Sequence, residues 1–239
     1  GHNIFSAQIP VQTLISNAQI SAVLEALGAG GKEVRFVGGC VRDAILKRES
    51  SEFDLATPER PERIIKLLKH AGINALPTGI KHGTITAVLG NTFCQITTLR
   101  KDVKTDGRHA IVEFTDDWKE DAARRDFTFN ALSATPQGRV YDYFNGLQDL
   151  SNRVIKFVGR AEERIMEDHL RILRYFRFIA VLGMRAGDQL THALCIKNAH
   201  LITNLSGERI RNELFKILES ENNCDALGLM IGSGVTEYF

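Results

Sequence analysis

Apolar residues recur at two different spacings along the first two thirds of the chain, which predicts both helices and strands. Helical spacing covers residues 9–27 and 41–46, and a further helix is expected from Pro61 to a stop at Gly72. Strand-like runs cover residues 34–37, 52–55, 83–89, 92–98, 140–144 and 154–159, and residues 101–109 are polar and predict a loop. The tight turn Gly90-Asn91 joins two of these runs as a hairpin, so part of the sheet is expected to be antiparallel.

After Gly159 the spacing of apolar residues is helical throughout. Predicted helices cover residues 162–182, 189–199 and 208–218, followed by a last apolar stretch from Ala226. This change of pattern predicts a domain boundary near residue 158. The fold class expected from it is α+β, with a mixed-sheet domain over residues 1–158 and an all-α domain over residues 159–239.

Composition limits the classes of partner. The 239 residues are 44% hydrophobic, which is enough for a sizeable core, and 30 basic against 29 acidic residues give a net charge of +1. A nucleic-acid partner must therefore be held by a local basic patch. The four cysteines are scattered along the sequence, which argues against a zinc site or a disulfide framework and favours a reducing compartment. The sequence has no run of 18 apolar residues, which argues against a membrane partner.

Two segments near the N-terminus carry candidate chemistry. The predicted strand 34–37 is followed by Gly38-Gly39 and a helix, an arrangement that can hold a phosphate, and Arg42 could reach the same anion. Such a turn also occurs for packing alone. On the strand 52–55, Glu52 and Asp54 share one face and would repel each other without a cation, so they are candidate Mg²⁺ ligands. The alternative is a solvated edge strand.

Arginines mark two further candidate sites. Arg124 and Arg125 stand beside Asp126 and before a run of apolar residues, which suggests an anion grip that enters a buried helix; alternatively they pair with acidic residues on a helix surface. In the predicted helix 162–182, a slanted polar stripe faces away from an apolar side. The stripe consists of Asp168, Arg171, Arg174 and Arg177. It could instead be a solvated face, with Asp168 and Arg171 as a weak i, i+3 ion pair.

Six segments occur in a fixed order along the chain: Gly38-Gly39-Cys40-Val41-Arg42-Asp43, Glu52-Phe53-Asp54-Leu55-Ala56-Thr57, Arg124 to Leu132, Asn145-Gly146-Leu147-Gln148-Asp149-Leu150, Glu167-Asp168-His169-Leu170-Arg171 and Leu205-Ser206-Gly207-Glu208-Arg209-Ile210. Together they resemble the class II tRNA nucleotidyltransferases, which are the CCA-adding enzymes and their bacterial poly(A) polymerase relatives. The resemblance implies a polymerase-β-like nucleotidyltransferase head with a mixed sheet over residues 1–158 and a helical, nucleotide-selecting neck over residues 159–239. Because the chain ends at Phe239, the body and tail domains of that family are expected to be absent.

The resemblance also implies roles for particular residues. Glu52 and Asp54 match the catalytic positions that hold Mg²⁺ in the family. The nucleotide-binding positions of the family correspond to Gly39, Arg42, Arg125, Asp168, Arg171, Arg174 and Arg177. Two departures stand out, because Glu52 replaces the more frequent Asp and Gln95 replaces the more frequent Glu.

The implied function is template-independent addition of CMP and AMP to the 3′ end of tRNA by Mg²⁺-dependent nucleotidyl transfer. Its partners would be the tRNA 3′ end, CTP and ATP, and neither a membrane nor a protein partner is implied. Its location would be the cytoplasm, and a mitochondrial location stays open. Asp168 accepts and Arg171 donates hydrogen bonds, which fits the Watson–Crick edges of C and A and not those of U and G. Two alternatives stay open: a poly(A) polymerase, and a catalytically impaired nucleotide- or RNA-binding remnant.

Overall fold

The computed structural model describes residues 5–10, 14–15, 18–50, 52–103, 111–183 and 188–239. The chain forms two compact units. Unit 1 contains residues 1–125 and 130–144, and unit 2 contains residues 126–129 and 145–239. The division into residues 1–158 and 159–239, which was predicted as a division into functional domains, stays a prediction.

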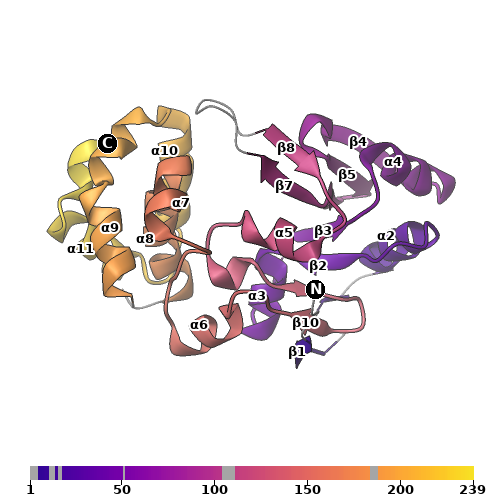
Figure 1. Ribbon diagram of the computed structural model, residues 1–239, viewed down its shortest axis with the longest axis horizontal. Coiled ribbons are helices and arrows are strands. Elements are labelled where there is room, and N and C mark those ends of the chain that lie inside the picture. Colours follow the sequence, from indigo (N-terminus) through magenta and orange to yellow (C-terminus); the bar gives the residue numbers. More distant parts are fainter. Residues whose placement is uncertain (1–4, 11–13, 16–17, 51, 104–110, 184–187) are drawn as a thin grey trace. The chain divides into compact units, whose positions relative to one another are not determined.

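Unit 1 is built on a mixed sheet of eight strands in the order β1-β10-β9-β2-β3-β6-β5-β4 (Figure 1). The strands are β1 (Phe5–Gln8), β2 (Arg35–Val37), β3 (Phe53–Thr57), β4 (Asn74–Gly79), β5 (Thr84–Leu89), β6 (Thr92–Thr98), β9 (Ser133–Ala134) and β10 (Arg139–Tyr141). Only β3 and β6 pair in parallel, while every other neighbouring pair in this sheet is antiparallel. A separate antiparallel pair is formed by β7 (Arg100–Val103) and β8 (Ile111–Phe114).

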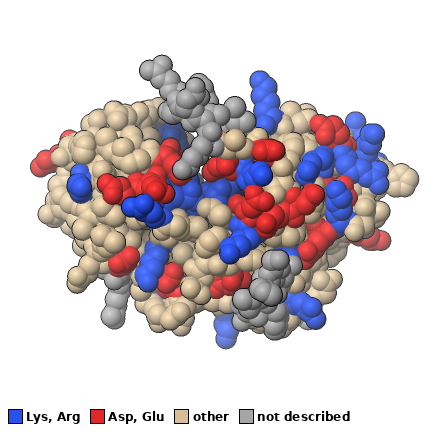
Figure 2. All heavy atoms as spheres, in the orientation of Figure 1, with Lys and Arg blue, Asp and Glu red and all other residues tan. Residues whose placement is uncertain are grey.

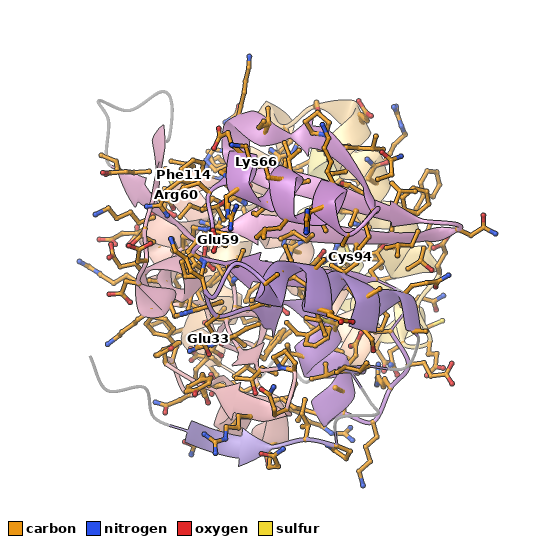
Figure 3. All side chains as sticks on the ribbon, turned by 90° about the vertical axis from the view of Figure 1, so that its right-hand side faces the viewer. Glu33, Glu59, Arg60, Lys66, Cys94 and Phe114 are labelled. Carbon is orange, nitrogen blue, oxygen red and sulfur yellow. The ribbon has the colours of Figure 1, made fainter. Side chains whose placement is uncertain are left out.

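The helices of unit 1 are α2 (Ala18–Gly28), α3 (Gly39–Ile45), α4 (Pro61–His70) and α5 (Trp118–Ala123). The predicted hairpin and the helix after Pro61 are confirmed, because β5 and β6 pair from Leu89↔Thr92 and α4 has Pro61 in its first turn. At the start of α4 the guanidinium carbon of Arg60 lies 5.7 Å from the ring centroid of Phe114 at the end of β8 (Figure 3). This contact ties the second strand pair to the α4 side of the sheet.

A fully buried arginine, Arg35, organises the core of unit 1. Its Nε and Nη2 donate to the two carboxylate oxygens of Glu33 at 2.8 and 3.0 Å. Its guanidinium carbon also lies 4.1 Å from the ring centroid of Trp118 on α5 and 3.9 Å from that of Tyr141 on β10. A buried cation is tolerated only when it is paired and hydrogen-bonded, so these contacts fix β2, α5 and β10 relative to one another.

Unit 2 is helical. Its elements are α6 (Gly146–Asn152), α7 (Ala161–Glu167), α8 (Leu170–Leu182), α9 (Gln189–Lys197), α10 (Gly207–Leu218) and α11 (Asn223–Gly232), with 3₁₀ turns at Ala199–Asn204 and Val235–Tyr238. Its buried centre is aromatic: Phe127 and Phe129 both make edge contacts with Phe178 of α8, at centroid distances of 5.4 and 5.3 Å. The apolar residues that follow Arg125 are thus buried, as the sequence suggested.

The helix predicted over residues 162–182 is wrong in one respect, because it is broken at Asp168. The backbone of Asp168 is extended, at φ −152° and ψ 107°, and its side-chain Oδ1 accepts from the N–H of Leu170 at 3.1 Å. An Asp side chain that caps the next N–H groups offers the backbone an alternative to the continuous helix. Asp168 therefore precedes α8, and only the three arginines of the stripe lie on it.

Several other expected elements also differ in the structure. Of the helix predicted over residues 9–27, the structure has α2 from Ala18 to Gly28, while residues 11–13 and 16–17 lie outside the described residues. The strand β1, Phe5–Gln8, was not predicted. Arg124 is the C-terminal cap residue of α5, and the residues after Arg125 form a 3₁₀ turn, Thr128–Asn130, in place of the expected buried helix. Residues 154–159 form an isolated bridge, Phe127↔Phe157, in place of a strand, and the preceding α6 was not predicted. Residues 101–103 belong to β7, and the rest of the predicted loop, residues 104–109, lies outside the described residues.

Within the described residues, the helices are too short and too polar for any of them to cross a lipid bilayer.

A stability prediction follows from Gly146 at the start of α6. A Cβ added there would collide with the carbonyl oxygen of Thr128 and lie 2.7 Å from its carbonyl carbon, and both are backbone atoms that cannot rotate away. Gly146→Ala should lower the free energy of unfolding by about 1–3 kcal/mol through overpacking. Gly228→Ala is the matched control, because Gly228 lies inside α11 with no atom within 4 Å of its added Cβ, and it should stabilise by about 0.5–1 kcal/mol. Urea denaturation measures both variants, and equal effects would contradict the packing at Gly146.

Candidate nucleotide and metal site

The two predicted metal ligands lie at the start of β3 in unit 1. Asp54 is half-buried on β3 and pairs in register with Val37 of β2 and with Gln95 of β6. Glu52 is exposed and immediately precedes the strand. Burial raises the pKa of the Asp54 carboxyl, the Arg125 charge opposes that rise, and the nearby Glu52 carboxylate adds to it. The Glu52 and Asp54 carboxylates are therefore close enough to influence each other, although Glu52 precedes the strand on which it was expected. That they share a metal ion stays a prediction.

This donor set fits a magnesium ion. Mg²⁺ is usually held by one or two carboxylates together with substrate phosphates and waters, and a dedicated cage of protein ligands is not required. Among the described residues, no three or more His, Cys, Asp or Glu side chains group as metal ligands, so Glu52 and Asp54 would need oxygen atoms from a substrate to complete the coordination. A cation beside Asp54 would also offset the charge repulsion from Glu52.

The Gly38-Gly39 turn brings the carboxylate and an arginine together. Gly38 has φ +71°, which strongly favours glycine, and a Cβ added there would lie 3.7 Å from Nη1 of Arg125 and 3.9 Å from Oδ2 of Asp54. A Cβ on Gly39 would lie 3.2 Å from Nη2 of Arg42. Both glycines therefore border charged groups that the sequence had proposed as functional, and they leave space next to them.

Arg42 and Arg125 are held by polar partners within unit 1. Arg42 donates from Nη1 to Oδ1 of Asn130 at 3.0 Å and from Nε and Nη2 to Oδ1 of Asp43 at 3.1 and 3.0 Å. Arg125 donates from Nη2 to Oδ2 of Asp121 at 3.5 Å. The two guanidinium groups are thus positioned before any ligand is bound.

Asp121 is a buried carboxylate that serves three arginines. It lies 3.5 Å from both Arg124 and Arg125 and accepts the backbone N–H of Arg100 at 3.1 Å. Burial lowers the pKa of Arg124 to about 10, an effect that Asp121 opposes and that Arg125 and Arg100 reinforce. The sequence alternative, in which the arginine pair contacts acidic residues of the helix, is therefore confirmed for Asp121, although this acid is buried and not on the surface. Anion binding by the pair stays a prediction.

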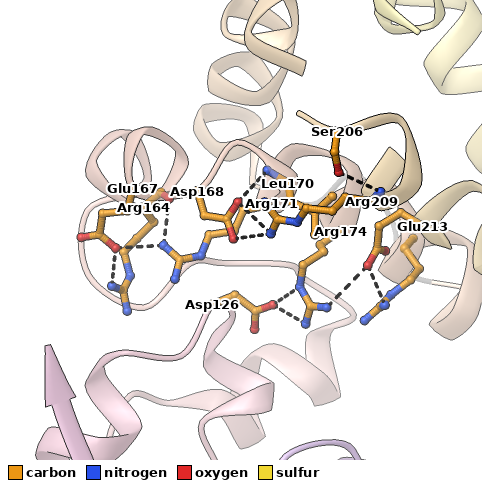
Figure 4. A network of polar contacts seen from close by, with 11 residues as sticks. Asp126, Arg164, Glu167, Asp168, Leu170, Arg171, Arg174, Ser206, Arg209 and Glu213 are labelled. Atoms are coloured by element: carbon orange, nitrogen blue, oxygen red, sulfur yellow. Dashed lines mark hydrogen bonds and ion pairs between the residues drawn. The ribbon is translucent and has the colours of Figure 1, made fainter. Parts of the chain in front are cut away.

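In unit 2 the two predicted base-selecting residues have separate partners (Figure 4). Asp168 accepts from Nη2 of Arg209, on α10, at 3.3 and 3.1 Å. Arg171 donates from Nη1 to the carbonyl oxygen of Arg164 and to Oε2 of Glu167, both at 2.9 Å. The i, i+3 ion pair between Asp168 and Arg171 that the sequence offered as an alternative is not formed, since each group binds elsewhere.

Glu167 holds two arginines at once. Its Oε2 accepts from Arg164 at 2.8 Å and from Arg171 at 2.9 Å. Burial would raise the pKa of the Glu167 carboxyl, but the hydrogen bonds and charges of Arg171 and Arg164 outweigh that effect and lower it. Glu167 is consequently a stable anionic anchor for Arg171 at neutral pH.

The remaining arginines of the stripe are anchored by distant carboxylates (Figure 4). Arg174 donates from Nε to Oδ2 of Asp126 at 2.6 Å. Arg177 donates from Nη1 to Oε1 of the buried Glu213 at 3.1 Å, and the same oxygen lies 3.9 Å from Nη1 of Arg174. The arginine stripe is therefore a neutralised network and not a solvated face.

No anchoring role was predicted for Glu167, Arg209 or Glu213, whereas Asp121 is one of the acidic residues that the sequence offered as partners of the arginine pair. Only spacing could have indicated them: Asp121 precedes Arg125 by four residues, Glu167 precedes Arg171 by four, and Arg209 and Glu213 are one helical turn apart on α10. On the face shown in Figure 2, lysine and arginine side chains are interspersed with acidic ones, so the basic side chains visible there form small groups.

Two family models match the chain. The poly A polymerase head domain matches residues 34–156, and the probable RNA and SrmB- binding site of polymerase A matches residues 188–239. The first of these covers most of unit 1, including the Gly38-Gly39 turn and both candidate metal ligands.

Named relatives agree with these models. The mitochondrial CCA tRNA nucleotidyltransferase 1 of Homo sapiens is 44% identical over 209 residues, which cover 86% of this chain and 48% of that protein. The CCA-adding enzyme of Lactobacillus delbrueckii subsp. bulgaricus is 39% identical over 221 residues, covering 92% of this chain and 54% of that protein. The chain thus spans about half the length of the relatives it matches.

Solved structures give the same answer for the fold. The Bacillus stearothermophilus CCA-adding enzyme in complex with CTP superposes with a TM-score of 0.83 at 33% identity, covering 92% of this chain and 53% of that one. A tRNA nucleotidyltransferase complexed with a primer tRNA and an incoming ATP analog superposes with a TM-score of 0.76 at 28% identity, covering 90% of this chain and 61% of that one. The predicted α+β class, a mixed-sheet head and a helical neck, is confirmed. The glycine turn, Glu52, Asp54, Arg42 and Arg125 all lie inside residues 34–156, and the chain belongs to the poly A polymerase head domain family, among relatives named as CCA-adding enzymes.

Proposed function

We propose that this chain carries the nucleotidyl-transfer chemistry of CCA addition, joining CMP and AMP to the 3′ end of tRNA. The observation that carries the proposal is the convergence, within unit 1, of Asp54 and Arg125 on the Gly38 turn. This juxtaposes a metal-binding carboxylate and a phosphate-binding guanidinium. The names of the relatives, which include complexes with CTP, an ATP analog and tRNA, support the choice of substrates.

In the proposed reaction the terminal hydroxyl of tRNA attacks the α-phosphate of CTP or ATP. The bond to the β-phosphate oxygen breaks, pyrophosphate leaves, and the hydroxyl proton passes to solvent. Mg²⁺, when bound, would lower the pKa of the attacking hydroxyl and neutralise charge on the phosphate oxygens. Glu52 and Asp54 would hold it, and no protein nucleophile is needed.

The arginines of unit 1 would bind the triphosphate. Planar guanidinium groups match phosphate oxygens in a bidentate manner, and Arg42 and Arg125 are already held by Asn130 and Asp121. The missing side chain at Gly39 leaves space beside Arg42 for an approaching anion. We assign this binding to the functional head, residues 1–158.

The residues of unit 2 would select the base. Asp168 accepts and Arg171 donates, so the pair matches the amino group and ring nitrogen of C or A. A base of the opposite pattern would leave polar groups unpaired at about 1–3 kcal/mol each. Arg174 and Arg177 would steady the triphosphate, and these four residues belong to the proposed neck, residues 159–239.

The location of the reaction is proposed from the relatives alone. Those named above include a bacterial and a mitochondrial protein, which supports the cytoplasm or the mitochondrion.

Incubation with tRNA that lacks its CCA end, together with Mg²⁺, CTP and ATP, tests the proposal. Products resolved at single-nucleotide length should stop after addition of two C residues and one A residue. A long A tail would identify a poly(A) polymerase. Absence of any extension and of pyrophosphate release would leave only a nucleotide-binding remnant.

Asp54→Asn should reduce transfer by more than about a hundredfold, since it removes a charge that stabilises the transition state. Nucleotide binding should persist, because Arg42 and Arg125 remain with their own partners. Asp225→Asn, an exposed change in α11, is the matched control and should leave transfer unchanged. Transfer and CTP affinity are measured by pyrophosphate release and calorimetry. Transfer that survives in Asp54→Asn would remove this residue from the metal site.

Asp168→Ala and Arg171→Ala should each lower incorporation of C and A about tenfold or more while changing U and G little, because each removes one matched hydrogen bond. Glu162→Ala, an exposed change on α7, serves as the control. Incorporation of all four nucleotides is measured separately. An equal loss for all four, with the preference for C and A intact, would show that the pair does not select the base.

A further inference from the structure

Hydrogen bonds within the protein use only part of the acceptor capacity of the Asp168 carboxylate. Its Oδ1 accepts two hydrogen bonds, from the N–H of Leu170 at 3.1 Å and from Nη2 of Arg209 at 3.3 Å. Within the described residues, its Oδ2 accepts one hydrogen bond, from the same Nη2 of Arg209 at 3.1 Å. Since each carboxylate oxygen can accept about two hydrogen bonds, Oδ1 is saturated and Oδ2 retains one acceptor position.

Hydrogen bonds within the described residues likewise use only one nitrogen of the Arg171 guanidinium, Nη1. Both protons of its Nη1 are used, one by the carbonyl oxygen of Arg164 and one by Oε2 of Glu167. Nε and Nη2 carry the other donor protons, and neither makes a hydrogen bond with the described part of the chain. Asp168 therefore retains one acceptor position and Arg171 retains donors, which are the two kinds of group that the edge of C or A requires.

The anchor of Asp168 comes from a different helix. Arg209 lies on α10, 41 residues from Asp168, whereas Leu170 is a near neighbour in the chain. Without Arg209 the carboxylate would keep only the Leu170 bond and could turn about its χ2 torsion, because such terminal torsions have broad minima. Its Oδ2 would then have no fixed direction.

We propose that Arg209 is a positioning residue for base selection, which orients Asp168 so that Oδ2 keeps one acceptor position for the amino group of C or A. The inference rests on the proposed function. Arg209 does not itself contact the base in this account; it acts through Asp168. Its ion pair is solvent-exposed, with side-chain exposures of 47% for Arg209 and 36% for Asp168, so its contribution to folding stability is small.

Equilibrium binding separates this role from a structural one. Isothermal titration calorimetry with Mg²⁺ and each of CTP, ATP, UTP and GTP is applied to the wild type, Arg209→Ala, Arg209→Lys and Arg211→Ala. Arg209→Ala should weaken CTP and ATP binding about fivefold and leave UTP and GTP nearly unchanged, as expected for loss of one orienting ion pair. Arg209→Lys retains a donor and a charge and should recover part of the loss. Arg211→Ala changes an exposed arginine of the same helix and should behave as wild type.

Each remaining outcome has a definite meaning. If Arg209→Ala weakens all four nucleotides equally, or matches Arg211→Ala, the positioning role is wrong while the proposed function stands. If the wild type binds none of the four nucleotides, the proposed function fails and this inference fails with it. Thermal melting of each variant, monitored by circular dichroism, identifies any loss of fold; if Arg209→Ala unfolds, Arg209→Lys carries the test, and its discrimination should lie below that of the wild type.

Discussion

Guanidinium groups repel one another, so several of them can be kept near a common surface only when carboxylates lie between them. Every arginine assigned here to nucleotide binding has such a partner within its own unit. In unit 1 the partners are Asp43 for Arg42 and Asp121 for Arg125, and in unit 2 they are Glu167 for Arg171, Asp126 for Arg174 and Glu213 for Arg177. The positions of the cationic groups are therefore set by the folded protein before a nucleotide arrives.

This arrangement has a consequence for binding energy. Long side chains lose rotamer freedom when a ligand immobilises them, and that loss opposes association. Arginines already held by carboxylates have lost much of that freedom during folding, so less is lost on binding. Neutralisation also explains how a chain with a net charge of +1 can hold several arginines close together within one unit.

Local patterns in the sequence were sufficient for many elements and for the positions of the motifs. The β5–β6 hairpin depends on Gly90-Asn91, and α4 depends on Pro61, so both could be predicted from neighbouring residues. The helix break at Asp168 could not, because the apolar periodicity continues through it, while the bonds of the Asp168 carboxylate to Leu170 and Arg209 form only in the folded chain. Residues 154–159 have strand-like composition, but only Phe157 finds a bridge partner, which is a property of the tertiary fold.

The anchors of Arg174 and Arg177 were equally inaccessible, for the same reason. Asp126 and Arg174 are 48 residues apart, and Arg177 and Glu213 are 36 apart, so neither pair leaves a periodic signal. The departures at Glu52 and Gln95 were visible in the sequence, but the neighbouring register of Asp54 and Gln95 required the sheet. Residue types indicated the chemistry, and only the structure supplied the partners.

A crystal structure of this chain with CTP and Mg²⁺ bound is the most direct test of whether carboxylates position the arginines before the nucleotide binds. The account predicts that Arg171, Arg174 and Arg177 contact the nucleotide while keeping their hydrogen bonds to Glu167, Asp126 and Glu213. A bound nucleotide that these arginines reach only after leaving those carboxylates, or that binds away from them, would contradict it.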